Sequence, residues 1–304
     1  MGRFLRHALA LAVLLAVLLP FLWMAYAAFM PKEAVYSGEL FSRVGFSLEN
    51  VRALAREGFW GRLLFSLGVS SGAVALELFT ALFAAYALRA GLGLLPFYLV
   101  LMAIPAELLL VPLYGVLKDL SLLETFWALL LPFAESPFVI YLVYQGMRAV
   151  PEELLEAAKL DGAGHRVLLF RILLPLVRPT LVAAGVLAFA AHWNLVLYPR
   201  VVVSDPGLWT LQTWLTDLQR KYPTDWGLLS AAALLSVLPI ALLYLLFERR
   251  VVATFEEVAS DKTKVIFKML FETAEECAKL KPYVVDKNEE NFDRLEVELT
   301  KMAL

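Results

Sequence analysis

The chain has 304 residues, of which 61% are hydrophobic and 18% charged, and its mean hydropathy is +0.71. One soluble core of this length could not bury so much apolar surface, so the composition excludes an ordinary soluble domain and predicts a membrane protein. The net charge of -2 gives no indication of nucleic-acid binding. The one cysteine, Cys277, cannot form an internal disulfide, and the three histidines show no metal-ligand spacing, so we expect no metal site.

Six apolar runs are long enough to cross a bilayer, which takes roughly 20 helical residues. Charges or aromatic residues at a plausible interfacial level bound each run. The sequence therefore predicts an all-α polytopic membrane protein with about six transmembrane helices. In chain order the runs are Ala8 to Phe29, Leu63 to Leu88, Leu92 to Leu117, Leu122 to Tyr144, Thr180 to Tyr198 and Leu228 to Phe247.

The first run has two interpretations. Arg3 and Arg6 before an apolar stretch, with "AYA" at Ala25 to Ala27, would suit a cleaved signal peptide. Its apolar region of about 22 residues is longer than the roughly 7 to 15 of such signals, which favours an uncleaved first span within residues 1–61. The basic residues favour an orientation with both termini cytoplasmic, in the cell (inner) membrane.

Acidic residues within apolar runs are candidates for function because a buried charge is costly in a membrane. Glu107 is expected to lie deepest, Glu77 is a second candidate, and Glu135, beside Ser136 and Pro137, is expected at a helix break. The alternative is that each is a polar group packed inside the bundle.

A charged segment, "PEELLEAAKLDGAGHRVLLFRILLPLVRP" (residues 151–179), separates the fourth and fifth runs. Pro151 suits a helix start, and Glu152 and Glu153 suit the positive end of the helix dipole. Gly162 suits the left-handed conformation that ends a helix. We predict one helix over "EELLEAAKL" and a second from about Gly164 to Leu174, forming a helix-turn-helix outside the bilayer. The alternative is a loop that only connects two spans.

This segment resembles the EAA loop of the membrane subunits of ATP-binding-cassette (ABC) importers. Flanking stretches such as "IPAELLLVPLYGVL" and "HWNLVLYPRVVVSDPGLWTL" resemble the carbohydrate-uptake branch, in the style of the second membrane subunit of maltose permeases. The resemblance covers about residues 62–250, a permease core of five spans with the EAA loop at 148–179. The matching positions are Glu156, Ala157, Ala158, Asp161, Gly162, Ala163, Phe170, Ile172, Leu174, Pro175 and Pro179.

The resemblance implies a mechanism in which the EAA loop docks on a cytoplasmic ATPase subunit and transmits its motion to the spans. It assigns the coupling role to Glu156, Ala157, Ala158, Asp161, Gly162, Ala163 and Pro175. It also implies an ATPase dimer, a second homologous permease subunit, an extracytoplasmic solute-binding protein and a sugar substrate. The chain has no GxxxxGK[ST] phosphate loop, so ATP would be bound and hydrolysed by the partner, and we expect no cofactor and no catalytic residue in this chain.

Residues of the "HWN" stretch are candidates for the substrate pathway, together with Glu107. Amide hydrogen bonds and an aromatic face are what a protein uses to hold a sugar, which points to Asn194 and Trp193. Trp193 would serve equally as an interfacial anchor. The resemblance further implies that Val201 to Gly227 is an external loop facing the binding protein, with aromatic packing as the alternative.

The tail, residues 251–304, departs from the family pattern. It carries 7 of its 8 basic residues as lysine and has 12 acidic residues, whereas the rest of the chain favours arginine. We interpret it as an appended or frameshifted segment, with a regulatory domain as the alternative, and expect amphipathic helices over "TKVIFKMLFETAEECAKL" and "NEENFDRLEVELTKMAL".

Two other functions compete with an importer subunit. A proton-coupled secondary transporter would use Glu77 or Glu107 as the proton carrier, and uptake driven by a pH gradient would identify it. An intramembrane enzyme is disfavoured because no nucleophile, base and metal ligands cluster in the sequence.

Overall fold

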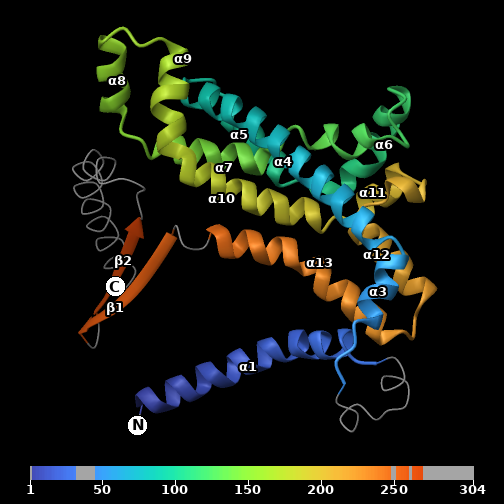
Figure 1. Cartoon of the computed structure of the whole chain (residues 1–304). Coiled ribbons are helices and arrows are strands. Elements are labelled where there is room, and N and C mark those ends of the chain that lie inside the picture. The colour runs from blue at the N-terminus through green and yellow to red at the C-terminus, as the bar shows by residue number, and fades with distance from the viewer. Residues whose placement is uncertain (1, 32–44, 248–250, 260–261, 270–304) are drawn as a thin grey trace. The chain divides into compact units, whose positions relative to one another are not determined.

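The computed structural model describes residues 2–31, 45–247, 251–259 and 262–269, with side chains described for residue 7 and for 9–31 and 45–247. The chain divides into two compact units, one of residues 1–147 and 180–244 and the other of residues 148–179 and 245–304. Figure 1 shows that the first unit is built of helices. Their bounds are α1 Gly2–Ala28, α3 Glu49–Arg56, α4 Phe59–Arg89, α5 Leu95–Met102, η1 Ala106–Leu109, α6 Leu110–Asp119, η2 Phe126–Leu129, η3 Leu131–Phe133, α7 Pro137–Arg148, α10 Leu174–Trp193, α11 Leu197–Val202, η5 Pro206–Leu208, α12 Leu211–Lys221 and α13 Trp226–Phe247.

The described helices account for up to six membrane spans. Four pass the tests of length and hydropathy alone: Leu9–Ala28, Phe59–Arg89, His165–Trp193 and Trp226–Phe247. Two more spans arise if each of two bent helix pairs is counted as one. The predicted all-α membrane protein with about six spans is therefore confirmed.

The third and fourth predicted spans are broken, and the sequence analysis predicted only the second of these breaks. The helix axis turns by 95° between α5 and the η1–α6 segment, and by 42° between the η2–η3 segment and α7. Pro105 stands at the first break in an extended conformation (φ -58°, ψ 130°), and Pro137 begins α7. Proline disfavours a helical conformation in the residue before it, so each break falls where a proline stands. The expected break at Glu135 to Pro137 is confirmed.

The first span is held to the unit at its C-terminal end. None of the described residues from Leu9 to Tyr26 of α1 is buried, whereas Ala27, Ala28 and Met30 are buried. The Asn50 side-chain amide donates to the carbonyls of Ala28 (3.1 Å) and Met30 (2.9 Å). These carbonyls lie beyond the last intrahelical hydrogen bond, so Asn50 provides the partner that the end of α1 lacks.

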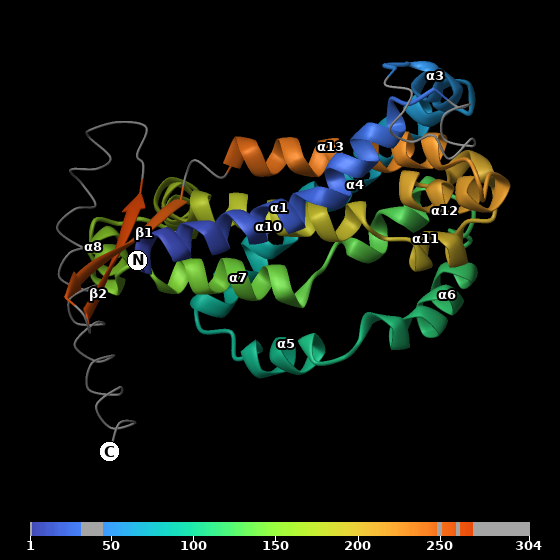
Figure 2. The ribbon, with the colours of Figure 1, turned by 90° about the horizontal axis from the view of Figure 1, so that it is seen from below.

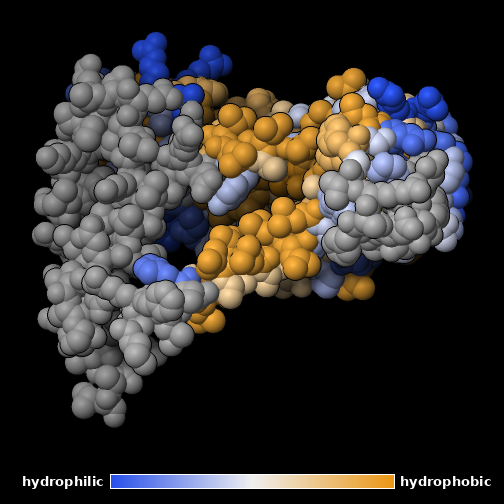
Figure 3. Space-filling view, turned by 60° about the horizontal axis from the view of Figure 1, so that its bottom comes forward, coloured by the Kyte–Doolittle hydropathy of each residue, from blue (hydrophilic) through white to orange (hydrophobic). Residues whose placement is uncertain are grey.

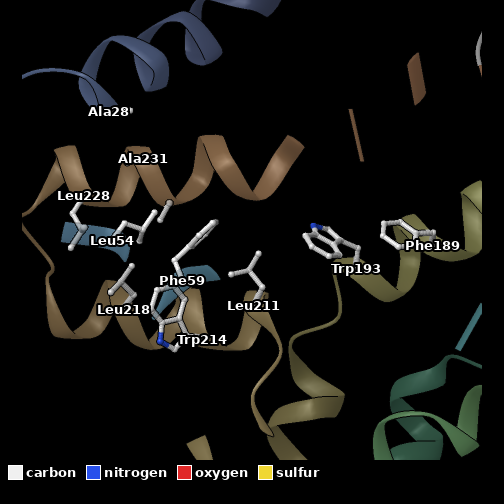
Figure 4. Close-up of a cluster of buried hydrophobic side chains, with 11 residues drawn as sticks. Ala28, Leu54, Phe59, Phe189, Trp193, Leu211, Trp214, Leu218, Leu228 and Ala231 are labelled. Carbon is white, nitrogen blue, oxygen red and sulfur yellow. The ribbon is translucent and has the colours of Figure 1, made fainter. Parts of the chain in front are cut away.

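A hydrophobic core joins α3, α4, α12 and α13. In Figure 4 side chains from these helices point toward one another, and Phe189 and Trp193 of α10 extend the cluster. The labelled members from the four helices are Leu54, Phe59, Leu211, Trp214, Leu218, Leu228 and Ala231. Trp214 of the predicted external loop is therefore a core residue, while Trp226 is exposed.

The surface of the first unit is apolar along its spans. Figure 3 shows a band of apolar side chains beside a polar region at the end where α3 and α12 lie. Figure 2 shows α5 at the edge of the unit, and none of its side chains is buried. Such a surface in a water-soluble monomer would be a liability, but in this chain it suits lipid or neighbouring spans.

The second unit contains the polar elbow and a β-hairpin. The elbow comprises α8 Glu152–Leu160, α9 His165–Val167 and the π-helix η4 Leu168–Leu173. Strands β1 Val251–Ala259 and β2 Lys262–Met269 pair antiparallel, from Val251 opposite Met269 to Ala259 opposite Lys262. The amphipathic helix expected from Thr263 is thus wrong over 263–269, where Thr263, Val265 and Ile266 are β-branched and favour a strand. The remaining expected tail helices lie outside the described residues.

Candidate functional site

The first leg of the elbow is the predicted helix, α8. Pro151 precedes it in an extended conformation (φ -55°, ψ 136°), and Glu152 and Glu153 occupy its first turn. Lys159 lies in the last turn and its ammonium approaches the Glu152 carboxylate at 4.0 Å. Acids at the start and a base at the end both complement the helix dipole, so the sequence stabilises this short helix locally.

The helix ends in a Schellman motif centred on Gly162. The Ala163 amide donates to the Ala158 carbonyl (2.9 Å) and the Gly162 amide donates to the Lys159 carbonyl (3.0 Å). Gly162 has φ +85°, the left-handed conformation that this motif requires and that glycine adopts without steric cost. The spacing of "EAAKLDGA" is therefore the spacing of a closed helix end, with Ala158 and Ala163 at its two hydrogen-bonded positions.

The second leg differs from the separate helix that the sequence predicts. The helical segment that starts at His165 continues to Trp193 as one candidate span, through the π-helical stretch η4 and past Pro175 and Pro179. Pro175 lies within this continuous segment, directly after the π-helical stretch. The π-helix packs against α8, and Leu155, Leu168 and Leu169 are buried. The elbow is thus an ordered helix-turn-helix and not a slack connection.

The predicted coupling residues are presented together on the elbow. Glu156, Ala157, Asp161 and Gly162 are exposed, and Ala158 and Ala163 are half-buried because they form the turn. Leu160, at the end of α8, is 90% exposed and adds an apolar side chain to the same surface. Pro175 is also exposed but belongs to the second leg.

The three candidate pathway residues lie in different settings. Glu107 is exposed in η1, just after the first helix break. Asn194 is exposed and its amide donates to the Ala190 carbonyl at 2.8 Å. Trp193 is buried, stacks on Phe189 at 5.6 Å and donates from Nε1 to the Ser236 carbonyl at 3.0 Å. Among the described residues no hydrogen bond or ion pair links Glu107 with the other two.

Sequence reasoning missed a buried polar pair. The Glu77 carboxylate lies 3.0 Å from His192 Nε2, and their side chains are only 5% and 9% exposed. The partners are 115 positions apart, so no local pattern signals their contact. Over the described part of the chain no group of three or more His, Cys, Asp or Glu side chains is arranged to hold a metal.

Two further carboxylates tie extramembrane segments together. Glu57, between α3 and α4, accepts hydrogen bonds from Lys221 Nζ (2.7 Å) and Tyr222 Oη (2.5 Å). The hydrogen bond from Lys221 is the largest cause that holds the pKa of Glu57 below its ordinary value, and the bond from Tyr222 is the second. Glu124 accepts from the amides of Ser204 (2.8 Å) and Asp205 (3.1 Å), and the Asp205 amide is the main cause that lowers the pKa of Glu124. Both contacts fix loops around α12 and α11.

Known proteins resemble this chain in sequence and in architecture. Residues 77–254 match the model of the family described as binding-protein-dependent transport system inner membrane component. The chain is 32% identical over 246 residues to the probable ABC transporter permease protein YurM of Bacillus subtilis, covering 78% of this chain and 81% of that protein. It is 28% identical to the diacetylchitobiose uptake system permease protein NgcG of Streptomyces coelicolor, covering 83% and 86% of the two chains.

A solved structure has the same fold. A chain of a bacterial ABC transporter involved in the import of the acidic polysaccharide alginate aligns with a TM-score of 0.70 at 20% identity, covering 82% of this chain and 95% of that one. The family match spans more than half of the sequence and includes the elbow and four of the spans. The chain therefore belongs to the family of binding-protein-dependent transport system inner membrane components and is a multi-pass permease subunit of an ABC importer, a transport component and not an enzyme.

Proposed function

We propose that this permease subunit imports a sugar, forms half of the translocation pathway with a second homologous subunit, and is driven by a separate cytoplasmic ATPase dimer. The observation that best supports this proposal is the structure of the elbow. It is an ordered turn with Glu156, Ala157 and Leu160 on its surface, and its first helix ends at Gly162. A rigid protrusion transmits a displacement that a flexible loop would absorb. With the elbow facing the cytoplasm, both chain termini are cytoplasmic in this proposal.

The substrate class follows from the relatives. NgcG is named for diacetylchitobiose uptake and the structurally similar importer carries alginate, so an oligosaccharide delivered by an extracytoplasmic binding protein is the proposed cargo. Glu107 and Asn194 are exposed polar groups able to hydrogen-bond sugar hydroxyls in the pathway. Trp193 would reach a solute only if its contact with Ser236 opened.

Gly162 provides the test of coupling. Gly162→Ala puts a Cβ at φ +85° and strains the turn by about 1–2 kcal/mol, and Gly162→Trp adds bulk on the exposed surface. We expect both variants to insert normally, to co-purify with less ATPase subunit and to lose ATP-driven uptake in proteoliposomes, Trp more than Ala. Gly164→Ala is the matched control, because Gly164 has an ordinary φ of -77° and open space around it.

Two results would contradict the proposal. One is wild-type ATPase yield and transport in Gly162→Trp. The other is sugar uptake by this chain alone under a pH gradient without ATP, which would instead identify a secondary transporter that uses Glu77 or Glu107.

A further inference from the structure

The buried pair of Glu77 and His192 has no place in the coupling or pathway roles above. Glu77 belongs to α4 and His192 to the last turn of α10, and both side chains are more than nine-tenths buried. Removing two ionisable groups from water costs free energy that a merely structural contact between apolar spans would avoid. We therefore expect the pair to have a role that apolar side chains at these positions could not have.

The pair lies where three segments meet. Phe133, the last residue of η3, and the His192 ring pack edge to face with centroids 4.5 Å apart. One turn beyond Glu77, the Thr80 hydroxyl donates to the Glu77 carbonyl and to the Ala134 carbonyl. Ala134 is in the break before α7, so α4, the break and α10 are held at one level.

The charged surroundings of the pair are few. Glu135 follows Ala134 in the break, and α13, which receives the neighbouring Trp193, has no charged residue between Trp226 and Phe247. The hydrogen bond between Glu77 and His192 is thus a main polar link between α4 and the end of α10.

The hydrogen bond that holds His192 to Glu77 also restricts the residues that follow His192. His192 and Trp193 are successive helical residues and point about 100° apart, and Asn194 continues the turn because its backbone amide donates to the Ala190 carbonyl (3.3 Å), so the three side chains face different directions. His192 is bonded to Glu77 and Trp193 to the Ser236 carbonyl, which leaves the helix end no freedom to rotate. Asn194, the exposed third residue, is then presented in one direction.

We propose that Glu77 and His192 are a positioning pair that sets the orientation of Asn194 toward the translocation pathway. This inference rests on the proposed function for the role of Asn194. It assigns Glu77 to shaping the pathway from within the bundle, and not to carrying a proton.

The first measurement is independent of transport. Cys277 is the only cysteine, so Cys277→Ser with Asn194→Cys gives one reporter thiol, whose rate of labelling by a maleimide is measured in the assembled complex. We expect Glu77→Ala and His192→Ala to change this rate. Glu77→Gln retains a hydrogen-bonding group for Nε2 and should keep the rate near that of the parent. Glu49→Gln, an exposed glutamate on α3, is the matched control and should leave the rate unchanged.

The second measurement uses chains with native Asn194 in proteoliposomes with ATPase and binding protein. The alanine variants should lower the maximal uptake rate about tenfold with little change in KM for the loaded binding protein, because delivery precedes the step that the pair organises. Glu77→Gln should restore most of the rate.

The outcomes are separable. Unchanged labelling in monodisperse Glu77→Ala and His192→Ala complexes would overturn the positioning role. If the alanine variants do not assemble, the glutamine variants decide. An equal loss of assembly in Glu77→Gln and His192→Gln would overturn the positioning role, since a positioning hydrogen bond tolerates these changes. Failure of the wild type to transport sugar would contradict the proposed function, while the labelling result would still decide on the pair.

Discussion

At the level of residues, Asn50 and Gly227 lie close together at the point where the first span is attached. A Cβ placed on Gly227 would lie 2.6 Å from Asn50 Nδ2, too close for any real contact. The Asn50 side chain is fully buried and is held by carbonyls at the end of α1, so it has no room to move aside. A glycine is therefore required at the start of α13 for a reason that involves α1.

Gly227→Ala should consequently destabilise the protein by about 1–3 kcal/mol, the typical cost of breaking buried hydrogen bonds. The measurement is the thermal unfolding midpoint of the purified protein in detergent. Gly68→Ala is the control, because Gly68 lies in α4 with nothing near its missing Cβ, and alanine favours a helix. Equal midpoints for the two variants would contradict the attachment described for α1.

At the level of elements, the ion pair of Glu57 and Lys221 joins the turn between α3 and α4 to the end of α12. The hydrogen bond with Lys221 lowers the pKa of Glu57 from its ordinary 4.5, and the bond with Glu57 raises the pKa of Lys221 from 10.5. A lowered carboxyl pKa contributes stability that is present above pH 4.5 and is lost as pH falls through the lower value in the folded state. A raised lysine pKa contributes stability that is present below pH 10.5 and is lost as pH rises through the higher value.

We expect Glu57→Gln to lower the thermal unfolding midpoint only within a limited range of pH. Between about pH 5 and 9 the variant should unfold roughly 1–3 °C below the wild type, a small difference because the pair is partly exposed. The two midpoints should converge as pH falls below about 4, where the carboxylate of the wild type is protonated. Glu49→Gln serves as control, and a difference that persists at pH 3 would show that the effect is not ionic.

The helices also show which structural features local sequence is sufficient to predict. The end of α8 was predictable because "DGA" after a helix specifies a Schellman turn by short-range hydrogen bonds alone. The bend of 95° after α5 was not predicted, although Pro105 was visible, because neighbouring helices decide whether a proline kinks a span or breaks it.

For the whole molecule, the tail lies beyond the C-terminal end of the family match, which covers residues 77–254. The family match ends at residue 254, and the hairpin continues to Met269. A chain that ends at residue 255 keeps every described span and the whole elbow.

We therefore expect deletion of residues 256–304 to leave assembly with the ATPase and sugar uptake close to those of the full chain. Size-exclusion chromatography of the complex and uptake in proteoliposomes measure the two properties. An assembled but inactive truncated complex would mean that the tail has a role in transport.

The sequence by itself determined the membrane class, the number of spans and the elbow. Hydropathy and helix-end chemistry depend on residues within one or two turns, and the spacing from Glu156 to Ala163 contains the whole turn. Only the tertiary structure decided that Trp193 is buried, that Glu77 meets His192 and that Asn50 holds α1. The contacts of these residues join positions at least 20 apart in the chain, and such contacts depend on how helices pack, for which a single sequence carries no local signal.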